Sequence, residues 1–155
     1  MVEVTRGNLL DADVDALVNT VNTVGVMGKG IALQVRKAFP QVYDAYKKAC
    51  DAGKVRPGRM HVAETGQLGP RLVINFPTKR HWRARARLED IDAGLVVLVR
   101  VLRERNIRSV AVPPLGCGNG GLDWEVVRPR IEKALRDLEE VRVLLFEPAG
   151  SPAPR

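Results

Sequence analysis

The pattern of apolar and polar residues along the chain predicts strands and helices in alternation. Short apolar runs predict strands over residues 2–6, 16–20, 60–65, 71–76, 109–112 and 141–146. Apolar residues that recur every three or four positions predict helices over residues 31–39, 41–52, 83–105 and 123–138. This alternation is typical of layered α/β folds, in which helices cover a sheet.

The chain has 155 residues, the length of one ordinary domain. We expect a folded domain over residues 1–148 and a linker or tail over residues 149–155, which are rich in Pro and Ala and lead to a possible further domain. No apolar run is long enough to cross a bilayer, and the first residues lack the layout of a signal peptide. We therefore expect a cytoplasmic protein without a membrane partner.

Composition adds two expectations about ligands. The two cysteines, Cys50 and Cys117, and the two histidines, His61 and His81, are scattered, so we expect no disulfide, no bound metal and no cofactor. The net charge of +7 favours a polyanionic partner, although a generally basic surface would give the same value.

A glycine-rich loop over residues 115–122 lies between the predicted strand 109–112 and the predicted helix 123–138. Glycines let backbone N–H groups approach an anion and a helix start adds a favourable dipole, so this layout suits a diphosphate. A tight turn without a ligand is the plainer alternative. The glycines also fit the dinucleotide fingerprint G-x-G-x-x-G, with Glu147 as the ribose-binding acid, but that motif would stand at the wrong end of the α/β pattern.

Another glycine-rich loop, over residues 23–32, comes earlier in the chain and follows the apolar run at 16–20; it is called the first loop below, and residues 115–122 the second. Lys29 follows a glycine as in a P-loop, but Thr23 occupies the place of that motif's first glycine, which argues against an NTPase. Asn22 beside this loop has the donor and acceptor that suit ribose hydroxyls. It is equally suited to capping a local turn.

The stretches VNTVNTVGVMGKGIALQ and PPLGCGNGGLDW resemble the two ligand loops of macrodomains, which are ADP-ribose-binding modules. The resemblance covers about residues 1–148 and implies a three-layer α/β/α sandwich with a mixed central sheet. It implies that residues 116–122 of the second loop hold the diphosphate and that Asn22 with residues 28–31 holds the distal ribose. Asn8 replaces the family's usual adenine-binding acid, and its side-chain carbonyl can accept the same hydrogen bond. The expected ADP-ribose contacts are Asn8, Leu9, Thr20, Asn22, Met27, Gly28, Lys29, Gly30, Ile31, Gly116, Cys117, Gly118, Asn119, Gly120, Gly121 and Leu122.

The stretch NFPTKRHWR places Lys79 after a predicted strand, as in the terminal ADP-ribose glycohydrolase subclass of macrodomains, which it resembles. That subclass includes antitoxins that remove ADP-ribose from DNA bases. The resemblance implies that Lys79 is a catalytic nucleophile, whose neutral amine forms a Schiff base that water resolves. Burial or a nearby cation such as Arg80 should lower its pKa. A relative pairs this lysine with an Asp where the present chain has Gly120, and Asp123 is better suited to capping the next helix.

Residues 79–87 carry five basic residues, one Trp and no acid. Arg83 and Arg87 are four residues apart and are expected to share a helix face. Basic side chains neutralise phosphates and aromatic ones stack on exposed bases. Trp82 is also suited to packing beneath the helix. The predicted DNA contacts are Arg80, His81, Trp82, Arg83 and Arg87.

These features together predict a DNA ADP-ribosyl glycohydrolase that acts on ADP-ribosylated single-stranded DNA. By the resemblance, it is the antitoxin to a cognate ADP-ribosyltransferase toxin. Two alternatives remain open. One is a module that binds ADP-ribose without cleaving it, which the missing acid at Gly120 favours. The other is a hydrolase of protein-linked ADP-ribose or of an ADP-ribose phosphomonoester.

Overall fold

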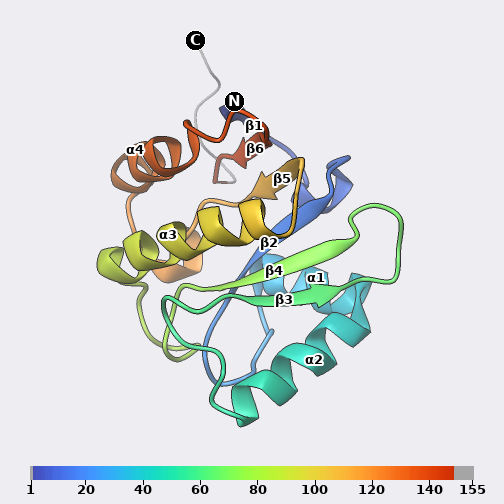
Figure 1. Ribbon diagram of the computed structural model, residues 1–155. Coiled ribbons are helices and arrows are strands. Elements are labelled where there is room, and N and C mark those ends of the chain that lie inside the picture. The colour runs from blue at the N-terminus through green and yellow to red at the C-terminus, as the bar shows by residue number, and fades with distance from the viewer. Residues whose placement is uncertain (1, 149–155) are drawn as a thin grey trace.

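The computed structural model describes residues 2–148, so the tail predicted over residues 149–155 lies outside the described residues. Strands and helices alternate along the chain as predicted (Figure 1). No helix in this described part is long and apolar enough to span a membrane. The elements are β1 (Val2–Thr5), η1 (Leu9–Asp11), β2 (Ala16–Val21), α1 (Gly30–Ala38), α2 (Pro40–Asp51), β3 (His61–Glu64), β4 (Leu72–Pro77), α3 (Leu88–Glu104), β5 (Ser109–Val112), η2 (Gly118–Gly120), α4 (Trp124–Leu135) and β6 (Arg142–Phe146).

The strands of the described residues form one six-stranded sheet with the order β1-β6-β5-β2-β4-β3. The β1–β6, β5–β6, β2–β5 and β2–β4 pairs are parallel, whereas β3 pairs antiparallel with β4. The sheet is therefore mixed, as predicted, and its antiparallel strand lies at one edge.

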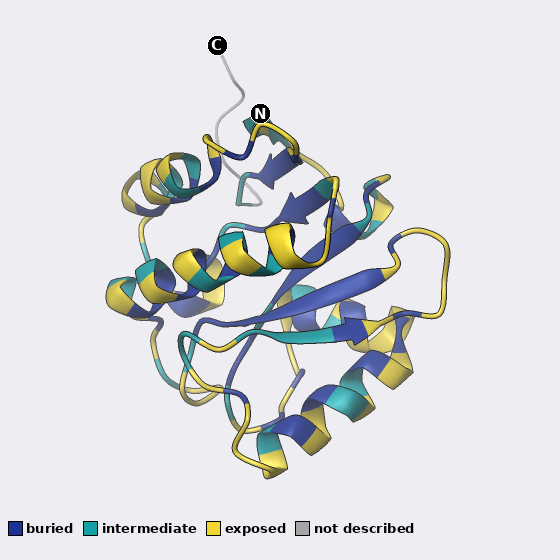
Figure 2. Ribbon diagram, viewed as in Figure 1, coloured by how far each residue is buried: buried dark blue, intermediate teal, exposed yellow. Residues whose placement is uncertain are grey.

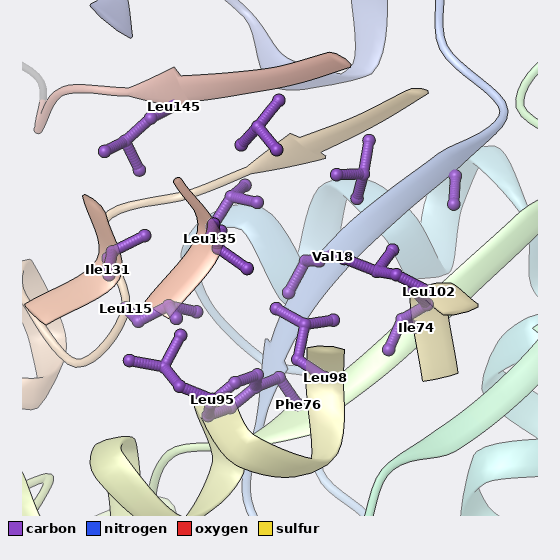
Figure 3. Close-up of a cluster of buried hydrophobic side chains, with 14 of the residues drawn as sticks. Val18, Ile74, Phe76, Leu95, Leu98, Leu102, Leu115, Ile131, Leu135 and Leu145 are labelled. Carbon is purple, nitrogen blue, oxygen red and sulfur yellow. The ribbon is translucent and has the colours of Figure 1, made fainter. Parts of the chain in front are cut away.

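Helices α3 and α4 cover one face of the sheet, and α1 and α2 cover the other (Figure 1). On one face, side chains of α3 and α4 such as Leu98 and Ile131 pack with Ile74 of β4 in the largest buried cluster (Figure 3). On the other face, Val35 of α1 and Val42 of α2 pack with the strands in a second cluster. Buried positions line the inner side of the helices and exposed ones the outer side (Figure 2). The predicted three-layer α/β/α sandwich is confirmed.

One helix begins later than its sequence pattern predicted. Helix α3 starts at Leu88, so the segment from Arg83 to Arg87 is a loop and these two arginines do not share a helix face. The backbone explains the difference, because the Ala86 N–H donates to the Gly120 carbonyl at 2.9 Å instead of to a helical carbonyl. The prediction of a helix from Arg83 was wrong because this long-range hydrogen bond has no signature in the local pattern.

The carboxyl ends of β2, β4, β5 and β6 lie at the same edge of the sheet, since these strands are parallel neighbours. The chain leaves β2 for α1 on one face, and it leaves the adjacent β5 for α4 on the other. Neighbouring strands whose connections diverge in this way leave a crevice between them, where α/β proteins bind ligands.

Candidate active site

A cleft of about 1110 Å³ opens at this crevice. It is lined by residues that follow β1, β2, β4, β5 and β6, including both glycine-rich loops. Its volume is slightly above the range of about 300–1,000 Å³ that is usual for small-molecule sites, so the cleft is large enough for a nucleotide-sized ligand.

Most of the site residues predicted from the sequence line this cleft, so the fold brings together segments that are far apart in the chain. Whether each one contacts a ligand stays a prediction. The predicted residues that line it are Asn8, Leu9, Thr20, Asn22, Gly28, Lys29, Gly30, Ile31, Lys79, Trp82, Arg83, Gly116, Cys117, Gly118, Asn119 and Gly120.

Three predicted ligand contacts lie outside the cleft lining. Met27 is fully buried in the cluster that includes Tyr46, so it supports the first loop from below. Leu122 packs against the main core, and the Gly121 carbonyl accepts a hydrogen bond from Arg85 at 3.1 Å. The sequence motif located these loops but did not distinguish residues that face the cleft from residues that hold the loop.

The sequence reasoning missed several lining residues. Phe146, the last residue of β6, lines the cleft together with Glu147 and Pro148, because β6 lies beside β5. The sequence suggests Glu147 only as the acid of the rejected dinucleotide fingerprint. Thr78 lines it after β4 and is buried. Each of these four residues stands at the carboxyl end of a parallel strand, a signal that identifies it only once the strand order is known.

The first loop is held by the side chain of Asn22, which is buried. Its Oδ1 accepts hydrogen bonds from the Val24 and Val26 N–H groups at 3.1 and 3.3 Å, and its Nδ2 donates to the Val26 carbonyl at 2.7 Å. The Tyr46 hydroxyl lies 2.9 Å from the same Oδ1. Asn22 therefore caps its own turn, which is the alternative to the ribose role proposed for its side chain.

Asn8 plays a similar local part at the other end of the cleft. Its Oδ1 accepts a hydrogen bond from the Leu10 N–H at 3.0 Å and so caps η1. A carbonyl oxygen has two lone pairs, and Asn8 is exposed. The oxygen thus keeps the capacity to accept a second hydrogen bond, as the adenine role requires.

The second loop is held by its own backbone. The Leu122 N–H donates to the Gly116 carbonyl at 2.9 Å, and the Gly121 N–H donates to the Gly118 carbonyl at 3.0 Å. Asp123 accepts a hydrogen bond from the Glu125 N–H at 3.0 Å and is the N-cap of α4, as predicted.

The two loops meet across the cleft at Gly30. A Cβ placed on Gly30 would lie 3.4 Å from the side-chain nitrogen of Asn119, and the φ of Gly30 is +57°. Glycine meets both requirements, a left-handed backbone and a close approach. The start of α1 and the turn of η2 therefore lie next to each other.

Lys79 lies where the two loops and the end of β4 converge. Its Nζ donates to the Trp82 carbonyl at 3.3 Å and to the Asn119 carbonyl at 3.5 Å. Burial, together with the positive charge of Lys29, lowers the pKa of the Lys79 amine. The lowered pKa was predicted, but the cation is Lys29 of the first loop and not Arg80, whose guanidinium pairs with Asp90 at 3.4 Å.

Lys79 forms no ion pair with a carboxylate of residues 2–148. Among the described residues that line the cleft the one carboxylate is that of Glu147, which is held by Arg6 at 2.9 Å and by Arg128 at 3.6 Å. An acid cannot simply be added at Gly120, because a Cβ there would lie 3.0 Å from the Cβ of Ala86. The packing of the second loop against Ala86 therefore disfavours the acid that the subclass has at this position.

The other potential nucleophile in the cleft is Cys117. Burial and the charge of Asp123 raise the pKa of its thiol to about 11, so the thiol is protonated at neutral pH and a poor nucleophile. Within residues 2–148 no three His, Cys, Asp or Glu side chains lie close enough to hold a metal ion. Lys79 is left as the cleft's best candidate for covalent chemistry.

The basic segment 79–87 forms one rim of the cleft. Trp82 is 41% exposed and stacks on His81, so it does not pack beneath a helix. Trp82 and Arg83 line the cleft, whereas His81 and Arg87 lie outside it and Arg80 is directed to its ion pair. The five predicted DNA contacts thus divide into two at the cleft and three away from it.

A model of the Macro domain family matches residues 18–131, which include both glycine-rich loops and Lys79. The chain belongs to the macro domain family. The resemblance drawn from the two loops is therefore confirmed, and the cleft occupies the position between those loops in this macrodomain.

This macrodomain is similar to those of DarG proteins. It is 58% identical over 151 residues to a Mycobacterium tuberculosis protein named DNA ADP-ribosyl glycohydrolase, covering 97% of this chain and 43% of that protein. The solved macrodomain of Mycobacterium tuberculosis DarG matches with a TM-score of 0.94 at 57% identity, over 96% of this chain and 99% of that one. Thermosipho africanus DarTG in complex with ADP-ribose matches with a TM-score of 0.90 at 33% identity, over 99% of this chain and 43% of that one.

Proposed function

We propose that this macrodomain is a DNA ADP-ribosyl glycohydrolase, which removes ADP-ribose from modified DNA bases. The chain spans about two fifths of the curated relative that bears this name. The activity of that whole relative is therefore a proposal for this chain. The observation that carries the proposal is the Lys79 amine, which lies between two glycine-rich loops and has a lowered pKa.

The proposed ligand position follows from the two loops. Within the second loop, the backbone N–H groups of Gly116, Gly118 and Asn119 suit a diphosphate, because the other four N–H groups of residues 116–122 already donate to nearby carbonyls. Glycines let an anion approach closely, and the start of α4 follows the loop. Residues 28–31 would then hold the distal ribose beside Lys79. The adenine end would lie near Asn8, whose side-chain oxygen retains one free lone pair. The complex of Thermosipho africanus DarTG with ADP-ribose supports this choice of ligand.

The proposed reaction begins with the neutral Lys79 amine. It forms a bond to the anomeric carbon of the distal ribose while the bond from that carbon to the base nitrogen breaks. The electron pair of the broken bond goes to the base, which takes up the proton that the amine loses. Opening of the ribose ring gives a Schiff base, and addition of water releases ADP-ribose and restores the amine.

The lowered pKa of Lys79 supports this role, since only the neutral amine has a free electron pair. Partial burial disfavours the charged form first, and the nearby charge of Lys29 disfavours it further. Sharing the proton between the amine and the leaving base also removes the need for a separate acid in the second loop, where Gly120 stands.

The test uses single-stranded DNA that carries ADP-ribosylated bases. Lys79→Ala should lower kcat by about 10³-fold or more while ADP-ribose binding, measured by calorimetry, changes little. Lys37→Ala, at the far end of α1, is the matched control and should behave as the wild type. Equal release by Lys79→Ala and wild type would remove Lys79 from the mechanism.

The absence of an acid at Gly120 also favours a second candidate, a macrodomain that binds ADP-ribose without cleaving it. The same measurements separate the two. Tight binding of ADP-ribose together with intact modified DNA in the presence of wild-type protein would establish the binding module. Release from a modified protein but not from DNA would assign the protein-linked substrate.

By similarity to DarG, we also infer a cognate DNA ADP-ribosyltransferase as the source of the substrate, with this macrodomain as its antitoxin. Co-expression tests this inference. The macrodomain should rescue growth of cells that express such a transferase, and Lys79→Ala should not.

A further inference from the structure

Trp82 presents an exposed aromatic stack at the rim of the cleft. The His81 and Trp82 rings are 5.3 Å apart with an interplanar angle of 29°. The guanidinium carbon of Arg83 lies 4.5 Å from the centre of the Trp82 ring. Trp82 is nevertheless 41% exposed, so much of its surface faces solvent. Such a ring beside a cation is the usual platform for an unpaired nucleobase.

This stack is fixed in place relative to Lys79. The Trp82 carbonyl accepts the hydrogen bond from the Lys79 amine, and the Thr23 hydroxyl donates to the Arg80 carbonyl at 2.6 Å. Further along, the Ala86 N–H is bonded to the second loop. The segment is therefore tied to both loops of the cleft, and a ligand that stacks on Trp82 does not have to order it first.

Arg80 and Arg83, which flank the His81–Trp82 stack in sequence, differ in what they are free to bind. Arg80 pairs with the buried carboxylate of Asp90, and that pair would have to break before Arg80 reached a phosphate. Arg83 has no carboxylate partner among residues 2–148, and it lies over Trp82 through a cation–π contact. An exposed cation–π contact is weak enough to exchange for another partner.

We infer that Trp82 stacks on the unmodified base next to the ADP-ribosylated one, and that this base displaces the Arg83 guanidinium, which then binds the adjoining phosphate. This inference rests on the proposed function, because that function puts the modified base next to Lys79. The modified base is tied to the carbon that Lys79 attacks, whereas the Trp82 side chain lines the cleft at its rim and is 41% exposed. A neighbouring base has to be unpaired to stack there, so the platform selects single-stranded DNA without reading its sequence.

The first experiment compares two substrates. One is a single-stranded oligonucleotide with one ADP-ribosylated base, and the other has abasic sites on both sides of that base. On the first substrate Trp82→Ala should lower kcat/KM roughly tenfold to a hundredfold, mainly through KM, and Trp82→Phe should restore most of it. On the second substrate the wild type should lose a similar factor, and the difference between wild type and Trp82→Ala should disappear.

Other results would overturn the inference. An equal loss by Trp82→Ala on both substrates would assign Trp82 to the modified base or to the fold, and no loss on the intact strand would remove it from recognition. If the wild type cleaves neither substrate, the proposed function fails. In that case fluorescence anisotropy measures the affinities of wild type and Trp82→Ala for the two substrates. These affinities still test whether a neighbouring base stacks on Trp82.

The second experiment tests the exchange of Arg83. Arg83→Gln should reduce the slope of log affinity against log salt for the intact strand by roughly 0.7, the value for one phosphate contact on single-stranded DNA. Arg136→Gln, at the end of α4, is the matched control and should leave the slope unchanged. An unchanged slope in Arg83→Gln would mean that Arg83 does not bind phosphate.

Discussion

The two glycine-rich loops face each other across one cleft, yet they are stabilised in different ways. The first is held by side chains, with Asn22 bonded to the backbone of its own turn and Tyr46 bonded to Asn22. The second is held by backbone hydrogen bonds and by glycines that pack closely on Leu122 and Ala86.

This difference determines which substitutions each loop tolerates. A loop held by buried polar side chains is damaged when a polar atom is removed, because its partners are left without hydrogen bonds. A loop that depends on the absence of side chains is damaged when a carbon is added. Similar glycine content in two loops therefore does not imply similar sensitivity to mutation.

The largest expected effect is that of Gly116→Val in the second loop. Gly116 has a φ of +75°, and a Cβ there would lie 2.7 Å from Cδ1 of Leu122. The left-handed backbone and the overpacking together should lower the free energy of unfolding by about 3 kcal/mol. Urea denaturation measures the change. Gly118→Ala is the control, since Gly118 has a φ of +64° but nothing within 4 Å of its Cβ, and it should cost only about 1 kcal/mol.

A smaller effect is expected when the support of the first loop is removed. Tyr46→Phe deletes a buried hydroxyl that lies 2.8 Å from the Asn22 carbonyl, and it should lower the free energy of unfolding by about 1–2 kcal/mol. Because the same hydroxyl contacts Asn22 Oδ1, the effects of Tyr46→Phe and Asn22→Ala should not be additive. Tyr43→Phe is the control, with a hydroxyl 3.4 Å from the Gly25 carbonyl. Strict additivity, measured by urea denaturation of both single variants and the double variant, would contradict the shared network.

Local pattern was enough to predict most of the fold. The apolar runs located the six strands of the described residues, and the glycines located both loops, because these signals are confined to a few neighbouring residues. The α3 start at Leu88 was mispredicted because the preceding residues bond to the second loop, a contact between distant parts of the chain.

The site was predicted in outline but not in its details for the same reason. Lys79 and the two loops carry recognisable motifs, whereas Phe146 and Glu147 reach the cleft only through the position of β6 in the sheet. The cation beside Lys79 was predicted to be its neighbour in sequence, Arg80. It is Lys29, because Asp90 binds Arg80 and the first loop folds toward Lys79.

The smallest expected effect tests this electrostatic link between the loops. Lys29 helps to lower the pKa of Lys79, after the larger effect of burial, so Lys29→Gln should raise that pKa. The neutral amine is the reactive form, and the pH profile of kcat/KM for the glycohydrolase should therefore move to higher pH, with severalfold lower activity below the Lys79 pKa. Above that pKa the variant should approach the wild-type rate, apart from any pH-independent loss of ligand binding. Lys37→Gln, at the opposite end of α1, is the control and should leave the profile in place. A uniform loss at every pH would instead mean that Lys29 acts only on ligand binding, and the two loops would then be linked by contact alone.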